Sequence, residues 1–400
     1  MKTLIVLDTP NESFTRVIEK AAKVAKLEDW EITSIVEEDI GGAYGHEQRF
    51  KQKFYETIEE PIYTSTGKLS KKTRKIVRKA ENLLQWEDSF NRTLRGRKPN
   101  LVVACGEEAL CSIVGVAGIS NYRGSIMGDK WGEYYKVLAV EHPSFILRGN
   151  PKDFWILAHD LQKAKRESEF PEIRREEWDQ VIQPKMEDVA GYLHWLQHHE
   201  SHLWTLDVET RAGTLACFSI ASRQASGKID TICIPIQTTS GPYWSPEEEL
   251  EIWRMMHETA NSNPSLCNQN IEYDIYYLLR YGVEPSGVWM DTMLAHSILY
   301  PEFPKGLDFL CSFYLDDVVY YKGEGRNWGA GDRDPQLWEY CCKDAVYTLR
   351  VVEKIDEELK RRNLFELYHG EQSRQHSVRD DGNEAQAQPR ELSNVEGVAV

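Results

Sequence analysis

Residues 203–210 read LWTLDVET, an apolar, strand-like run that ends in two carboxylates separated by one valine. Successive side chains of a strand point to opposite faces, so Asp207 and Glu209 stand on the same face. Two carboxylates this close repel each other unless a positive charge lies between them. Such a pair alone is more typical of an exposed strand edge, so it indicates a site only if further acids join it.

Further acids lie in two downstream segments at helical spacing. Asn270 and Asp274 are four residues apart in NQNIEYDIYYLLRYGV, and Tyr340 and Asp344 share a helix face in LWEYCCKDAVYTLRVVEKI. Each pair alone is more typical of a capped helix start or a hydrogen-bonded helix pair. Together the three segments offer four acids, Asp207, Glu209, Asp274 and Asp344. Mg²⁺ and Mn²⁺ take oxygen ligands, and two such ions can hold the attacking and leaving oxygens of a phosphoryl displacement.

The three acid-bearing segments also resemble a known family. LDVET, NQNIEYD and YCCKD resemble the three exonuclease motifs of the DEDD superfamily, in the Tyr-bearing class that hydrolyses nucleic acids from 3′ to 5′. The intervening WMDTMLAHSILYPEFPKGLDFLCSFY and VVYYKGEGRNW resemble the proofreading domains of phage-type family-A DNA polymerases. The resemblance covers residues 184–368 and implies an α/β domain of the RNase H-like fold, with a mixed sheet and helices. The resembled polymerases carry a polymerase domain after the exonuclease domain, and we expect that domain to be absent here.

The resemblance implies a role for each matching residue. Tyr340 would orient the attacking water, and Asn270 would support substrate or loop geometry. A bound metal would lower the pKa of that water enough to supply hydroxide near neutral pH. The metal ligands of the two-metal site would be Asp207, Glu209, Asp274 and Asp344.

Four other residues of this domain have plainer interpretations. Asp291 in WMDTM is expected to cap the start of a helix, and His296 to be a packed or surface histidine. Aromatic side chains stack single-stranded bases in a sequence-tolerant way. Tyr321 and Trp328 are candidates for such stacking of a frayed 3′ end.

The N-terminal part alternates short apolar strands with helical patterns, which indicates a parallel α/β sheet. PNLVVACGEEALCSIVG, NYRGSIM and VLAVEHPSFILR resemble the uracil-DNA glycosylase superfamily over residues 1–168, which implies a three-layer α/β sandwich. In that family the histidine of His-Pro-Ser, here His142, stabilises the departing uracil anion of a flipped base. The first family motif would fall at LDTPNESF, where only Pro10 fits. A module that docks DNA or a partner and an active glycosylase both remain open.

Three segments lie outside these domain cores. We expect a charged linker at 169–183 and a disordered polar tail at 369–400. Residues 68–98 carry eleven Lys and Arg against three acids, so they form either a solvated helix face or a nucleic-acid contact.

The net charge and the hydropathy of the chain argue against some classes of function. The net charge of −16 argues against general affinity for phosphate backbones, so nucleic-acid contact requires a local basic surface or bound cations. No window approaches the roughly 18 apolar residues of a membrane span, so we expect a protein of the cytoplasm of a bacterial or phage-infected cell. The eight cysteines form no C-x-x-C pair and are expected to be reduced and mostly buried.

The sequence therefore predicts a metal-dependent 3′-5′ exonuclease that shortens single-stranded or frayed DNA ends in proofreading or repair during replication. Its expected partners are a primer 3′ end and a separately encoded DNA polymerase, with no membrane. Two alternatives remain: a non-catalytic module that docks DNA or a polymerase, and uracil removal by the N-terminal domain.

Overall fold

The computed structural model describes residues 2–63, 69–132, 135–199, 203–325 and 334–370. The chain forms two compact units. The first consists of Met1–Trp178 and Glu302–Asp332, and the second of Asp179–Pro301 and Arg333–Val400. The C-terminal tail beyond residue 370, for which disorder was expected, lies outside the described residues, as does Trp328.

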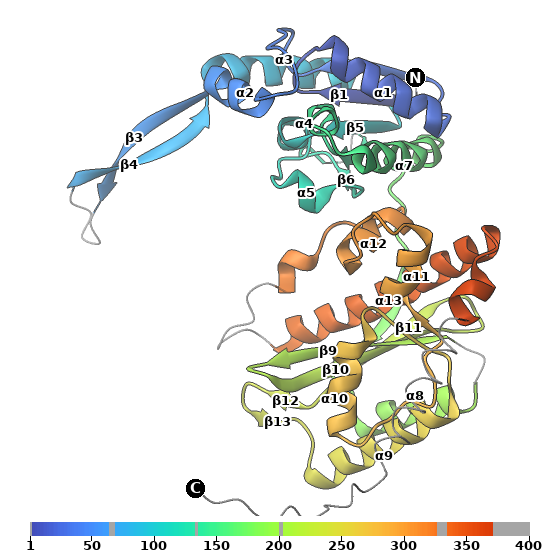
Figure 1. Cartoon of the computed structure of the whole chain (residues 1–400). Helices are drawn as coiled ribbons and strands as arrows, with labels where there is room; N and C mark the ends of the chain where they lie inside the picture. The colour runs from blue at the N-terminus through green and yellow to red at the C-terminus, as the bar shows by residue number, and fades with distance from the viewer. Residues whose placement is uncertain (1, 64–68, 133–134, 200–202, 326–333, 371–400) are drawn as a thin grey trace, which may run out of the picture. The chain divides into compact units, whose positions relative to one another are not determined.

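The first unit is built on a five-stranded sheet in the order β2-β1-β5-β7-β6 (Figure 1). Strands β2, β1, β5 and β7 run parallel, and β6 is an antiparallel edge strand. Every residue of the central strands β1, β5 and β7 is buried, as expected of a parallel sheet covered on both faces. The strands are β1 (Thr3–Leu7), β2 (Trp30–Ser34), β5 (Leu101–Cys105), β6 (Ile126–Gly128) and β7 (Lys136–Val140).

Helices cover both faces of this sheet and give it three layers. One apolar core packs the sheet against α1 (Glu12–Ala25), α6 (Pro143–Leu147) and α7 (Pro151–Glu167). A second core, on the opposite face, packs it against α2 (His46–Phe54), α3 (Glu81–Arg97) and α4 (Glu107–Ile113). The short α5 (Ile119–Tyr122) follows α4. The α/β class and the layered arrangement expected of the N-terminal part are confirmed.

A long hairpin of β3 (Tyr55–Tyr63) and β4 (Leu69–Lys79) projects from this unit (Figure 1). Part of the basic segment 68–98 is therefore a strand, and only its second part, α3, is a helix. The helix-face interpretation was wrong for β4 because pairing with β3 overrides local spacing. Lys75 lies opposite Glu59, and Arg78 lies opposite Glu56 with Nε 2.7 Å from Oε1. The hairpin thus offsets part of its own positive charge.

The segment 302–325 packs within the first unit through α12 (Leu307–Tyr314) and the 3₁₀ turn η1 (Lys322–Gly325). The buried Lys163 donates from Nζ to the carbonyl oxygens of Gly124 at 2.9 Å and of Ser312 and Leu315 at 2.7 Å. Gly124 has φ +77°, and a Cβ there would lie 2.7 Å from the Ser312 oxygen, so only glycine permits this approach. These contacts bind a stretch expected in the exonuclease domain to the first unit.

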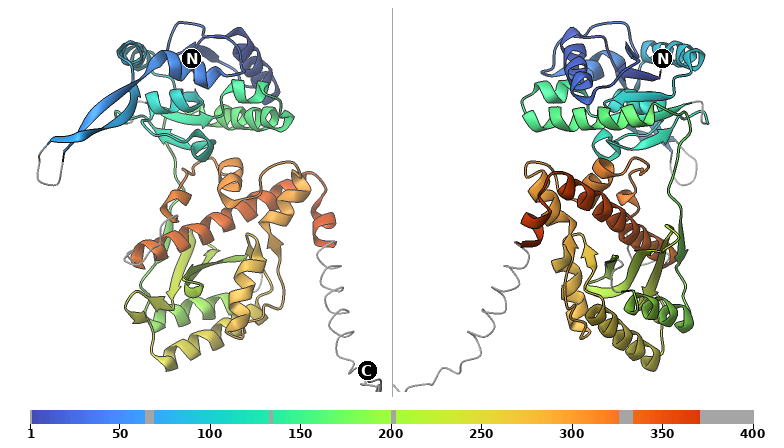
Figure 2. Two further views of the ribbon diagram at one scale, coloured as in Figure 1. Left: turned by 60° about the vertical axis from the view of Figure 1, so that its left-hand side comes forward. Right: turned by 90° about the vertical axis from the view of Figure 1, so that its right-hand side faces the viewer.

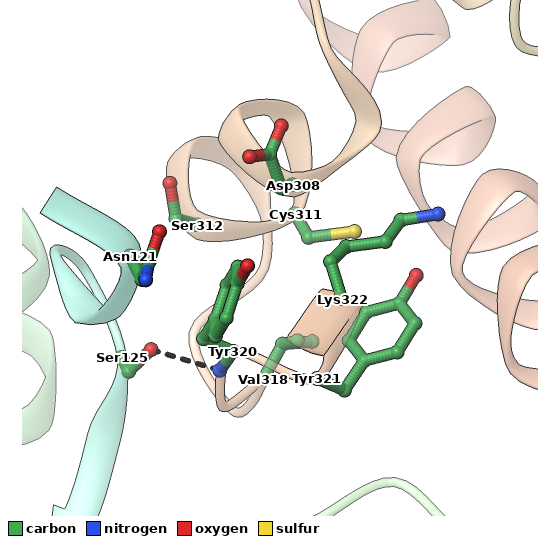
Figure 3. Close-up of a pocket in the computed structure, with 9 residues that line it drawn as sticks. All are labelled: Asn121, Ser125, Asp308, Cys311, Ser312, Val318, Tyr320, Tyr321 and Lys322. Carbon is green, nitrogen blue, oxygen red and sulfur yellow. Dashed lines mark hydrogen bonds between the residues drawn. The ribbon is translucent and has the colours of Figure 1, made fainter. Parts of the chain in front are cut away.

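The same segment lines a small pocket with residues of the first unit (Figure 3). Its wall includes Asn121, Asp308 and Tyr321, and the backbone N–H of Tyr320 donates to Ser125 Oγ at 3.1 Å. Tyr321 is only 7% exposed, so this residue, a candidate for base stacking, is mostly enclosed by protein.

The second unit contains a six-stranded sheet in the order β15-β14-β9-β10-β11-β8. Strands β9, β10 and β11 form the expected antiparallel meander, and β14 pairs parallel with both β9 and β15. The stretch expected to be a linker contributes the edge strand β8. The strands are β8 (Trp178–Val181), β9 (Trp204–Arg211), β10 (Thr214–Arg223), β11 (Ile229–Pro235), β14 (Leu266–Asn268) and β15 (Met290–Asp291). A small ribbon, β12 (Gln237–Thr238) with β13 (Gly241–Pro242), follows β11.

Helices pack on both faces of this second sheet (Figure 2). A large apolar core joins one face to α8 (Met186–Gln197), α9 (Pro246–Ser262) and α10 (Ile271–Arg280). The long α13 (Asp334–Arg361) crosses the other face over β9, β10 and β11, and α11 (Thr292–Leu299) packs against it. This mixed sheet with helices confirms the α/β fold class expected for the C-terminal domain.

All eight cysteines are free, and all except Cys111 are buried, which confirms the expectation of reduced thiols. Within the described ranges, the structure contains no helix with the length and apolar character needed to cross a membrane.

Candidate active site

Strand β9 separates an apolar face from an acidic one by simple alternation. Trp204, Leu206 and Val208 point into the large apolar core. Asp207 and Glu209 alternate with these apolar residues along the strand. Their side chains therefore lie on the other face of the sheet, toward α13. The sequence prediction that the two acids share one face of a strand is thus met by β9.

Helix α13 brings the second pair of predicted residues to this face. Thr205 Oγ1 donates to the Ala345 carbonyl at 2.7 Å, which fixes the helix against β9 next to Asp344. Asp344 and Tyr340 are 3% and 7% exposed. Carboxylate oxygens of Asp207, Glu209 and Asp344 all lie within 4.8 Å of one another.

Helix α10 supplies the fourth acid, Asp274. The backbone N–H of Val208 on β9 donates to Asp274 Oδ1 at 2.9 Å, so this buried carboxylate is tied to the strand between the other two acids. The structure thus brings all four predicted acids to β9 or to the helix that crosses it.

The N-terminus of α10 depends on a residue whose wider role the sequence did not show. Asp291 caps α11 by accepting from the Met293 N–H at 2.8 Å, as expected. It also accepts from the N–H groups of Asn270 at 3.1 Å and Ile271 at 3.0 Å. Asn270 itself has φ +57°, a left-handed conformation that asparagine tolerates. Asp291 therefore holds the bend that starts the helix of Asp274.

His296 is fully buried on α11, which agrees with the interpretation as a packed histidine. The imidazole has a packing neighbour in Tyr300, with ring centroids 5.5 Å apart. It lies among the helices that support the site, and we assign it no part in the chemistry.

The electrostatics of the cluster are unfavourable without a cation. Burial raises the pKa of Asp207 well above its usual range, and the nearby Asp344, Glu209 and Asp274 raise it further. Burial likewise raises the pKa of Asp274. Asp207 Oδ2 is buried and has no hydrogen-bond partner among the described residues. An orphaned carboxylate oxygen among three other acids is what a site for hard divalent cations requires, so these residues fit Mg²⁺ or Mn²⁺.

A mixed α/β unit with clustered acids and a buried tyrosine one helical turn away has the features of a metal-dependent nuclease. Comparison with known protein families supports nuclease function for part of the chain. Residues 201–360 match the family model described as 3′-5′ exonuclease. The match makes nuclease chemistry the supported function of this stretch.

The individual proteins that this chain resembles share little sequence identity with it. DNA polymerase I of Borreliella burgdorferi is 26% identical over 172 residues, which are 41% of this chain and 18% of that protein. This chain thus spans less than a fifth of the length of that curated relative. Among solved structures, the catalytic core of RRP6 from Trypanosoma brucei gives a TM-score of 0.36 at 14% identity, over 49% of this chain and 50% of that one. Brucella melitensis NrnC with bound Mg²⁺ gives 0.32 at 17% identity, over 48% and 90%.

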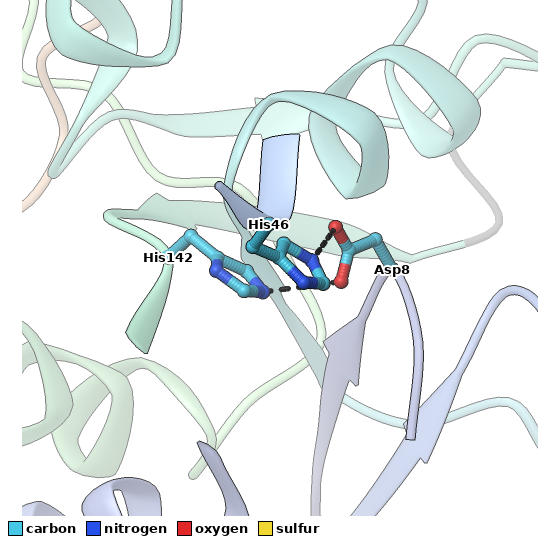
Figure 4. Close-up of side chains that lie close together, drawn as sticks. All are labelled: Asp8, His46 and His142. Carbon is cyan, nitrogen blue, oxygen red and sulfur yellow. Dashed lines mark hydrogen bonds and ion pairs between the residues drawn. The ribbon is translucent and has the colours of Figure 1, made fainter. Parts of the chain in front are cut away.

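The remaining predicted residue, His142, lies in the first unit beside two residues that the sequence did not single out (Figure 4). Its Nε2 is 3.1 Å from Asp8 Oδ1, and His46 Nε2 is 2.8 Å from Asp8 Oδ2. Burial acts to raise the pKa of Asp8, but the imidazoles of His142 and His46 hold it below its usual range. Asp8 directly follows an apolar strand, as Asp207 follows the apolar residues that begin another, and this pattern could have identified Asp8 in the sequence. His46 carries no such signal, because only the tertiary fold brings it there.

Proposed function

We propose that the second unit hydrolyses single-stranded or frayed DNA from the 3′ end and serves proofreading or repair during replication. The observation that carries the proposal is the convergence of Asp207, Glu209 and Asp344 within 4.8 Å, next to the buried Asp274. A non-catalytic docking module would gain nothing from the mutual repulsion of these carboxylates. A primer 3′ end is the substrate of the proposal, and a separately encoded DNA polymerase its partner.

In this proposal each side chain has one task. Asp207, Glu209, Asp274 and Asp344 would hold two divalent ions, which would supply a low-pKa water and stabilise the attacking and leaving oxygens. Tyr340, on the same face of α13 as Asp344, orients the attacking water through its hydroxyl. The Val208 N–H keeps Asp274 aimed at the cluster, and Asp291 keeps α10 in register with it.

The proposal predicts that Asp344→Ala slows hydrolysis by about a thousandfold, because loss of a metal ligand costs several kcal/mol of transition-state stabilisation. The measurement uses 5′-labelled single-stranded DNA with Mg²⁺, Mn²⁺ or EDTA and follows the ladder of shortened products. Glu357→Gln is the matched control, because Glu357 is an exposed acid of the same helix that pairs with Lys354 at 3.0 Å. An intact substrate with every metal, from folded protein, would favour the docking module instead.

Uracil removal by the first unit has less support. His142 lines a pocket, but its Nε2 contacts Asp8, and four glutamates line the same pocket. Such surroundings disfavour the departure of an anionic base. The test is abasic-site formation on uracil-containing DNA, which as a glycosylase reaction would be abolished by His142→Ala and retained by Asp344→Ala.

A further inference from the structure

The cluster of Asp8, His46 and His142 occupies the position in the first unit where open α/β sheets bind ligands. Asp8 directly follows β1, and His142 lies two residues beyond the end of β7. Because β2 and β5 flank β1 on opposite sides, the order of strands reverses between β1 and β5. Ligands of such sheets bind outside the carboxyl ends of the strands at this reversal.

The backbone is shaped to bring these side chains together. Gly106, which follows β5, has φ +87°, and a Cβ there would lie 2.8 Å from the Cβ of His142. Any other residue at this position would push His142 away from Asp8. The rings of His46 and His142 stack with centroids 4.9 Å apart and an interplanar angle of 9°, so both present Nε2 toward the same carboxylate (Figure 4).

The three side chains form the donor set of a transition-metal site. Their potential ligand atoms all lie within 4.8 Å of one another. Two imidazoles and one carboxylate are the nitrogen and oxygen ligands that borderline divalent metals prefer. His46 is 3% exposed, so its imidazole is enclosed by the protein next to Asp8.

The surrounding pocket favours a cation over an anion. It has a volume of about 300 Å³ and is lined by four further acids, Glu47, Glu107, Glu108 and Glu141. Arg148 is the one Lys or Arg side chain in its described lining. Phosphate or another anion would meet net negative charge here, whereas a divalent cation would be stabilised by it.

We propose that the first unit binds one divalent transition-metal ion of the Zn²⁺ type through Asp8, His46 and His142. His142 Nδ1 accepts from the Ser144 backbone N–H at 3.1 Å and lies 2.7 Å from Ser144 Oγ, and these contacts fix the orientation of its ring. Three protein ligands beside an open pocket leave a position for water, the arrangement of reactive rather than purely structural sites.

The test measures metal content in the full chain carrying Asp344→Asn, which weakens the acid centre of the second unit. This parent protein is loaded with Zn²⁺, freed of excess metal by gel filtration and analysed for bound zinc per chain. His46→Gln and Asp8→Asn are then introduced one at a time. His257→Gln is the matched control, because this histidine is exposed and forms its hydrogen bonds in the described structure with the Gly282 carbonyl and Asn261.

The expected result is the loss of one equivalent of zinc in His46→Gln and in Asp8→Asn, and no loss in His257→Gln. Thermal melting gives an independent readout, since Zn²⁺ should raise the melting temperature of the parent and not that of either variant. Circular dichroism checks that each variant is folded, and Asp8→Asn preserves the shape of the side chain in case His46→Gln fails to fold. Unchanged zinc content in a folded variant, or no zinc in the parent, would overturn the proposal.

Discussion

Asp207 is a residue whose proposed function as a metal ligand lowers the stability of the fold. Its Oδ2 is buried without a hydrogen-bond partner in the described structure, and three other acids lie nearby. Burying an unpaired polar or charged group destabilises the fold unless a partner compensates it. In our proposal this partner is a divalent cation. In the metal-free protein the buried carboxylate therefore destabilises the fold, and no cation offsets that destabilisation.

The destabilisation caused by the buried Asp207 can be measured. Asp207→Asn should raise the free energy of unfolding of the metal-free protein by about 1 kcal/mol, because it removes one charge from the cluster. Urea denaturation in EDTA measures the change, with Glu357→Gln as the control. Adding Mg²⁺ should stabilise the unsubstituted protein more than the variant. A variant that is less stable in EDTA and equally stabilised by Mg²⁺ would show that the acids hold no cation.

At the scale of elements, the two faces of β9 and the length of α13 build the catalytic cluster. Both features can be predicted from residue spacing in the sequence. Residues two apart, such as Asp207 and Glu209, share one face of a strand, and residues four apart, such as Tyr340 and Asp344, share one face of a helix. Contacts between distant segments could not be read in this way. The bonds from Asp291 to the start of α10, the approach of His46 to Asp8 and the pairing of β4 with β3 all depend on tertiary structure.

A second element-scale feature is the attachment of α12 to α7 by Lys163. Burial lowers the pKa of Lys163 to about 8. Its three carbonyl acceptors nevertheless require three N–H donors, which only the ammonium form provides. The resemblance to an exonuclease domain placed residues 302–325 in one continuous domain, because sequence patterns do not show which neighbour a connecting segment packs against.

Lys163→Met should therefore lower the free energy of unfolding of the first unit by about 2 to 4 kcal/mol, since it leaves buried carbonyls without donors. Urea denaturation followed by tryptophan fluorescence measures the loss. Lys165→Met is the matched control, because Lys165 is exposed on the same helix. Equal effects of the two substitutions would mean that the three hydrogen bonds do not hold α12 in place.

At the scale of the whole molecule, the net charge of −16 opposes any contact with a phosphate backbone. Two bound divalent cations at the four acids would neutralise the local negative charge and make contact with DNA more favourable. The hairpin of β3 and β4 adds less positive charge than its lysines and arginines suggest, since Glu56 and Glu59 lie opposite two of them.

Binding of single-stranded DNA should consequently weaken at least tenfold in EDTA relative to Ca²⁺ or Mg²⁺. Fluorescence anisotropy of the unsubstituted protein measures this, with a labelled oligonucleotide whose linkages resist hydrolysis so that the probe stays intact in Mg²⁺. An affinity unchanged by EDTA would place the main DNA contact away from the acid cluster.

The most direct test of the central claim is the direction of hydrolysis. Two 5′-labelled single strands of one sequence, one with a free 3′ hydroxyl and one with an inverted 3′ terminus, are incubated with the protein and Mg²⁺. We predict a ladder that shortens from the free 3′ end and an intact blocked strand. Equal cleavage of both strands, or cleavage in EDTA, would contradict a metal-dependent 3′-5′ exonuclease built on Asp207, Glu209, Asp274 and Asp344.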